Sequence, residues 1–197
     1  MANISRVRAT INYGLGGPGL GTFYFASNTG IPTSAELLDM VARVRAFYAA
    51  LANFLTTGTS VLVQGQVDTI DEATGTLIRS DSTTPPAAVV GVGSANQLPP
   101  TTAIVVQLNT ATVIGGRILR GRSFVGPLNI TAATGSGGPV TGVGTAAVAA
   151  GTALLAVTST IIPRIWHRPK APGSGASGAI TGATAWSSFG SLRSRRD

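Results

Sequence analysis

The sequence has no cysteine and a single histidine, His167. The absence of cysteine excludes disulfides, thiolate metal sites and cysteine nucleophiles. A single histidine also excludes a metal site built from several histidines. A Ser-His-Asp triad would depend on His167, which has no acidic residue near it in the sequence. No catalytic motif stands elsewhere in the chain, so the sequence predicts a protein that is not an enzyme and that binds no cofactor and no metal.

Charged residues are scarce as well, at 11% of the 197 residues against 44% hydrophobic. A surface so poor in charge is typical of a protein that is covered by neighbouring subunits. The net charge is +7, and Lys170 is the single lysine among 14 basic residues. Arginine favours bidentate contacts at interfaces, although a coding bias towards arginine would give the same composition.

The hydrophobic pattern predicts a mainly β chain with two helices (α+β). Residues 5–13 alternate Val7, Ala9 and Ile11 with polar residues, as a strand with one buried face does. Further strands are expected near residues 21–26, 59–70, 75–80, 101–109, 117–125 and 161–167. Gly/Pro turns separate these many short strands, and an extended C-terminal arm is expected to follow them.

The first helix is expected near residues 34–56, because Thr33 and Glu36 have the spacing of a capping box and Gly58 follows as a stop. One apolar stripe runs along it. Its members are Leu37, Val41, Val44, Tyr48, Leu51 and Leu55. Leu38 and two phenylalanines widen the stripe beyond a coiled-coil seam, which predicts packing on a sheet or groove.

Acidic residues are concentrated around the turn that follows the strand near 59–70. Asp68, Asp71 and Glu72 offer oxygen ligands for calcium, but they lack the spacing and the closing glutamate of a calcium loop. Asp71 and Gly75 are also turn formers. We therefore expect these residues to form the turn, by side-chain hydrogen bonds and a positive φ at Gly75, with a calcium site as the alternative.

An apolar run without charge occupies residues 140–162 and is long enough to span a bilayer. It consists mostly of Ala, Gly and Thr, so we expect a buried helix near 143–158 instead of a membrane span. Residues 1–170 are then a β-rich core domain, and residues 171–197 a Gly/Ser linker and C-terminal arm. The N-terminal residues contain no apolar signal-peptide segment.

The candidate contact residues are arginines and the apolar anchors of the arm. They are Arg117, Arg120, Arg122, Arg164, Arg168, Trp186, Phe189, Arg193, Arg195 and Arg196. On a strand, Arg120 and Arg122 would share one face. Ile118 and Leu119, which lie within the Arg117 to Arg122 cluster, are aliphatic rather than stacking aromatics. This favours contacts between subunits over a nucleic-acid-binding module using that cluster.

Three segments carry a resemblance: the hairpin TIDEATGTLI at 69–78, the strand that begins at LPP and leads into GGRILRGRSFVGPL at 98–128, and the tryptophan before LRSRRD at 186–197. With them the chain resembles small virion structural proteins, capsid or tail-associated, of bacteriophages and uncultured viruses. The resemblance implies an antiparallel β-sandwich, jelly-roll-like, which agrees with the many short strands separated by Gly/Pro turns. It also implies a protein of the virion, assembled in the host cytoplasm as a large homo-oligomer, with other virion proteins and packaged nucleic acid as further partners. A membrane-associated virion protein that uses 140–162 is the remaining alternative.

Overall fold

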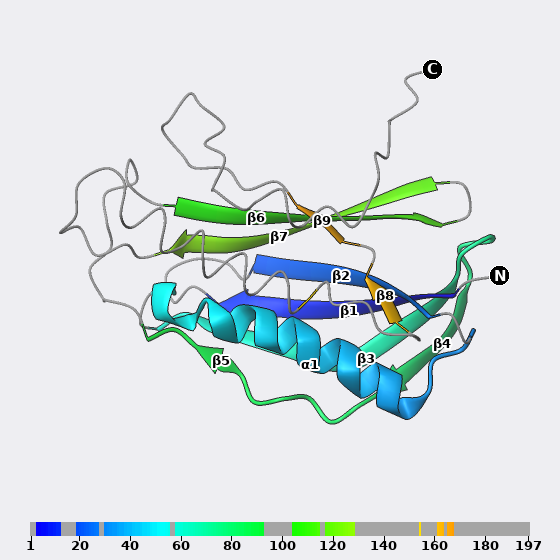
Figure 1. Cartoon of the computed structure of the whole chain (residues 1–197), viewed down its shortest axis with the longest axis horizontal. Coiled ribbons are helices and arrows are strands. Elements are labelled where there is room, and N and C mark those ends of the chain that lie inside the picture. The colour runs from blue at the N-terminus through cyan, green and yellow to red at the C-terminus, as the bar shows by residue number, and fades with distance from the viewer. Residues whose placement is uncertain are drawn as a thin grey trace, which may run out of the picture.

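The computed structural model describes residues 3–12, 19–27, 30–55, 58–92, 104–114, 117–128, 154, 161–163 and 165–167. In the last four strands the description covers the backbone and the side chain of Ile114. These residues form a mainly β, antiparallel fold with one long helix (Figure 1). Among them, no helix has the length and apolar character needed to cross a bilayer.

Six strands form the larger sheet. They are β1 (Asn3–Asn12), β2 (Gly19–Ser27), β3 (Ser60–Asp71), β4 (Leu77–Ser82), β5 (Val89–Val90) and β8 (Ile161–Pro163). The order is β4-β3-β1-β2-β8, and β5 pairs with the start of β3. All pairs are antiparallel, so that Val7 lies between Phe23 on β2 and Val67 on β3. The N-terminal strand therefore occupies the middle of the sheet.

The helix α1 (Ser34–Ala50) covers one face of this sheet (Figure 1). It begins with the predicted capping box: the Thr33 hydroxyl accepts from the Glu36 amide at 3.3 Å, and the Glu36 carboxylate accepts from the Thr33 amide at 2.7 Å. The predicted stripe is buried, and the helix packs on a sheet as expected. The prediction that Leu38 widens this stripe is wrong, because Leu38 is 49% exposed, whereas Met40 is fully buried in the core.

The core lies between α1 and the sheet. Its largest side chains are aromatic: the Phe23, Phe47 and Tyr48 rings have centroids 5.2 to 6.2 Å apart, in tilted and edge-to-face arrangements that aromatic pairs prefer. Odd-numbered residues of β1 and β2 supply the sheet side of this core, as a period of two requires. Leu154 is helical and buried in the same core, and the rest of the helix expected near 143–158 lies outside the described residues.

The helix ends earlier than predicted. It stops at Ala50 and is followed by a 3-10 turn, Ala52–Phe54, rather than continuing to residue 56. The Ala52 carbonyl accepts from the Val92 amide at 3.0 Å and from the Leu55 amide at 3.2 Å. The tighter turn thus ties the end of the helix to the segment after β5 and keeps Leu51 and Leu55 in the core.

A second sheet contains β6 (Ile104–Ile114), β7 (Arg117–Leu128) and β9 (Ile165–His167), in the order β7-β6-β9. The hairpin β6–β7 lies beside β2 on the side away from α1 (Figure 1). Ile114 joins Ile4, Tyr24, Ala26 and Ile70 in a second buried cluster on that face.

The strand expected near 161–167 is two short strands, because β8 pairs with β2 and β9 pairs with β6. Pro163 ends β8, since a proline has no N–H with which to continue a ladder. The chain therefore passes from one sheet to the other within these few residues.

Candidate functional site

The face of the larger sheet that α1 leaves uncovered carries an unusual set of charges. Alternation on β1 directs Val7 and Ala9 towards the helix and sends Arg6 and Arg8 to the opposite face. Register places Arg6 opposite Asp68 of β3. Asp68 is 4% exposed, so a buried carboxylate lies at the centre of this face.

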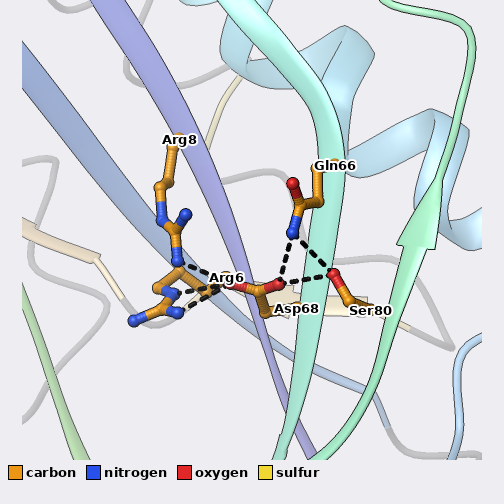
Figure 2. Close-up of polar contacts among 5 residues, drawn as sticks. All are labelled: Arg6, Arg8, Gln66, Asp68 and Ser80. Atoms are coloured by element: carbon orange, nitrogen blue, oxygen red, sulfur yellow. Dashed lines mark hydrogen bonds and ion pairs between the residues drawn. The ribbon is translucent and has the colours of Figure 1, made fainter.

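The two arginines converge on one oxygen of that carboxylate (Figure 2). Asp68 Oδ2 accepts from Arg6 Nη2 and from Arg8 Nη2, each at 2.7 Å, and from Arg6 Nε at 3.2 Å. Asp68 Oδ1 accepts from the Ser80 hydroxyl at 2.7 Å and from Gln66 Nε2 at 3.3 Å. Gln66 also donates to Ser80 at 2.8 Å, which closes the network. We call these five residues the Asp68 cluster.

The Asp68 cluster has two positive charges and one negative charge, hence a net charge of +1. Burial raises the pKa of Asp68, but hydrogen bonds from Arg6 and Ser80 and the charges of both arginines outweigh that effect, so the pKa lies below its usual range. The Arg6 and Arg8 side chains are 29% and 37% exposed, against 6% for Asp68. The cluster can therefore present guanidinium N–H donors to an anionic group.

Tyr24 lies next to the cluster, opposite Arg6 in the register of β1 and β2. Burial raises the pKa of its phenol, and the charges of Arg6 and Arg8 act in the other direction. Tyr24 is 5% exposed and belongs to the apolar cluster that contains Ile114. Tyr24 thus lies between the Asp68 cluster and the buried apolar cluster that contains Ile4 and Ile114.

The geometry does not suit the calcium alternative. Both oxygens of Asp68 accept from N–H and O–H donors, and the two nearest charges are positive. Asp71 instead accepts from the Thr74 amide at 2.6 Å and the Thr74 hydroxyl at 2.8 Å, and the backbone bond is the main reason why its pKa is lowered. Gly75 completes the turn with φ of 76°. The predicted roles of Asp71 and Gly75 in the turn are confirmed. The described residues contain no group of three or more acidic or histidine side chains placed to hold a metal ion.

The same face becomes apolar at its other end. Thr10 of β1 pairs with Leu20 of β2 on one side and with Leu62 of β3 on the other. Val90 of β5 pairs with Ser60, two residues before Leu62, and so lies on the same face. Leu20, Leu62 and Val90 are 63%, 47% and 57% exposed. We call these three residues the apolar row.

Of the residues predicted from sequence to make contacts, Arg117, Arg120 and Arg122 lie on β7. Arg120 pairs with Ala111 and Arg122 with Asn109, positions on one face of the hairpin. Arg117 pairs with Ile114, a position on the other face, so the backbone register separates it from the other two. Outside the described residues lie Arg164, Arg168, Trp186, Phe189, Arg193, Arg195 and Arg196.

The sequence patterns do not predict the Asp68 cluster. Arg6 and Arg8 are among the polar residues that alternate with Val7, Ala9 and Ile11, and local spacing groups Asp68 with the acidic residues of the following turn. The signal that could have revealed the cluster is Asp68 itself. In the strand Ser60–Asp71 it is the one charged residue ahead of the terminal Asp71. A buried charge requires a partner, and Arg6 and Arg8 stood on another strand with the matching period.

No family model, curated protein or solved structure matches the chain. Its function is therefore inferred from its own sequence and surfaces.

Proposed function

We propose that the chain is a non-enzymatic structural protein of a viral particle, which self-assembles into a capsid shell or a head or tail component. The apolar row carries the proposal. Leu20, Leu62 and Val90 leave large aliphatic surface in water on the sheet face opposite α1, at the end of β1 away from the buried cluster of Ile114. Contiguous exposed apolar side chains mark interaction sites, and a neighbouring subunit would remove them from water.

The proposed subunit is an antiparallel β-sandwich, jelly-roll-like, in which β6, β7 and β9 make the second layer. Three features support this architecture. Ile114 of β6 is buried with residues of β1, β2 and β3. The strands β8 and β9 belong to different sheets, as a chain that turns a sandwich corner requires. The buried Leu154 is consistent with a second helix in the core.

The viral setting rests on the resemblance of residues 69–78, 98–128 and 186–197 to small virion proteins. In such a particle the arm, residues 171–197, would reach neighbouring copies through Trp186 and Phe189, and its arginines would contact other subunits. The expected location is the virion. Little surface charge favours close contact between copies, because few charged groups would lose their hydration on assembly.

The test is the size of the purified protein. Light scattering coupled to size exclusion should find large assemblies, and negative-stain images should show regular particles or rings. Replacing Leu20 and Leu62 together by serine should shift the population towards monomers while the unfolding temperature stays nearly unchanged. Leu38→Ser is the matched control, because Leu38 is similarly exposed, at 49%, but lies on the helix. A stable monomer under all conditions would refute the proposal.

Contact with packaged nucleic acid is a second candidate, favoured by the uneven distribution of charge. Residues 93–197 contain nine basic residues and one acidic residue, whereas residues 1–92 contain five and six. On β7, Arg120 and Arg122 occupy positions on one face. Binding of single-stranded or double-stranded nucleic acid should then weaken steeply with salt, and Arg120→Ala should reduce it without loss of assembly. Salt-independent binding, or none, would exclude this role.

A further inference from the structure

The strand β4 is the outermost strand of the larger sheet at one side. One of its edges pairs with β3, from Ser82 opposite Gln66 to Leu77 opposite Ile70. Within the described part of the chain, no strand pairs with its other edge. Alternate N–H and C=O groups of Leu77–Ser82 therefore point outwards and are available to a further strand.

The free edge has a defined length. Immediately after β4, the Thr83 amide donates to the Gly65 carbonyl at 2.7 Å, which keeps the chain next to β3 for one more residue. Pro85 and Pro86 follow, and prolines cannot donate to a ladder. A partner strand can therefore pair with the six residues of β4 and not beyond them.

The side chains of β4 are exposed along nearly its whole length, and Asp81 alone is half-buried. Two of them are large and apolar: Leu77 is 58% exposed and Ile78 is 41% exposed. Natural edge strands usually avoid this combination of apolar side chains and unpaired backbone groups, because it invites pairing with another chain. Such an edge is expected where pairing is part of the function.

The charges of β4 are complementary to a copy of themselves. Arg79 and Asp81 lie two residues apart on one face of the strand and form an ion pair. If two β4 strands run antiparallel with Ser80 opposite Ser80, Arg79 of each copy lies opposite Asp81 of the other. A shift by one residue in either direction would place Arg79 opposite a serine instead, either Ser80 or Ser82. The charge pattern thus selects one register.

We propose that β4 pairs with β4 of a second copy, antiparallel and around a two-fold axis at Ser80, so that the larger sheet continues from one subunit into the next. This pairing rests on the proposed self-assembly and specifies one of its contacts. A two-fold contact uses the same surface on both copies, which is the commonest arrangement in homo-oligomers. The backbone ladder provides the attachment, and the two cross-strand ion pairs fix its register.

Charge reversal tests the pairing. In Arg79→Asp, two acidic residues of each copy would face two acidic residues of the other, and in Asp81→Arg the contact would be all basic. Each variant alone should dissociate at concentrations about tenfold higher or more than the wild type, measured by sedimentation velocity. An equimolar mixture of the two should form one-to-one heterodimers across this contact, because every charge then meets its opposite.

Two controls separate the contact from effects on folding. The double variant Arg79→Asp/Asp81→Arg preserves both the ion pair within the strand and the self-complementary pattern, so it should associate like the wild type. Arg45→Asp reverses an exposed charge that lies on α1 instead, where Arg45 donates to the Ala87 carbonyl, and it should not change association.

The possible results are distinct. If the wild type assembles and the mixture associates no better than each variant alone, the β4 contact is wrong while the proposed assembly stands. If the wild type is a monomer at every concentration, both are wrong. Two results together support the contact at this register. The two charge-reversed variants associate with each other in the mixture, and neither of them gains association when it is mixed with Arg45→Asp.

Discussion

Replacing Asp68 by asparagine should be among the most destabilising single-atom changes on the sheet face away from α1. The substitution keeps the shape of the side chain and removes the one negative charge that Arg6 and Arg8 share. Breaking a fully buried ion pair by removing one partner costs about 3–5 kcal/mol. Because the two arginines are 29% and 37% exposed and keep part of their hydration, we expect a smaller loss, about 2 kcal/mol in the free energy of unfolding.

Thermal unfolding followed by circular dichroism would measure this loss. In a chain of 197 residues, about 2 kcal/mol corresponds to a decrease in Tm of roughly 4–8 °C. Asp39→Asn is the matched control: Asp39 pairs with Arg43 on α1 and its side chain is 42% exposed, so its loss should cost under about 0.5 kcal/mol.

The effect should also depend on pH. The pKa of Asp68 is lower in the folded protein than in the unfolded chain. Its contribution to stability is therefore fully present above the unfolded pKa of about 3.9 and is lost as the pH falls through the folded value. The difference in Tm between wild type and Asp68→Asn should be constant near neutral pH and should close below about pH 4. Equal losses for the Asp68 and Asp39 variants, or a gap that persists in acid, would refute this account of the cluster.

Three further predictions test the fold, each by the free energy of unfolding in denaturant. Thr33→Ala removes the helix cap and should cost about 0.5–2 kcal/mol, whereas Thr33→Ser should restore most of it. Phe47→Ala empties part of the aromatic core and should cost about 3–5 kcal/mol, whereas Leu62→Ala, on the exposed face, should cost under about 1 kcal/mol; similar losses would contradict the assigned burial. Gly65→Ala would place a Cβ 2.4 Å from the Thr83 carbonyl oxygen, so it should destabilise the sheet where β4 ends, and an unchanged stability would show that the two segments do not approach so closely.

Local sequence patterns predicted the elements that depend on neighbours in the chain. The capping box of Thr33 and Glu36, the alternation of Val7, Ala9 and Ile11, and the turn at Asp71 each involve residues a few positions apart. These patterns therefore specify the helix start, the buried face of β1 and the β3–β4 hairpin.

Contacts between distant segments could not be predicted in the same way. Arg6 and Asp68 are 62 positions apart and meet because β1 inserts between β2 and β3, an order that periodicity does not encode. Beyond the helix end at Ala50, the Ala52 carbonyl accepts from the Val92 amide, which again belongs to a distant segment. The division of residues 161–167 between two sheets follows from Pro163 and from strands far away in sequence.

The central position of β1 has a consequence for how the chain folds during synthesis. The hairpin of β1 and β2 is local and can form early, with α1 made directly after it. The other edge of β1 stays unpaired until β3 has been synthesised, because Ile4 pairs with Ile70 and Ile11 pairs with Val61. Until then Arg6 and Arg8 lack their carboxylate and remain in water. Two unpaired positive charges thus stand beside the open edge of β1 in the nascent chain, and they oppose its pairing with the same edge of another chain until β3 arrives.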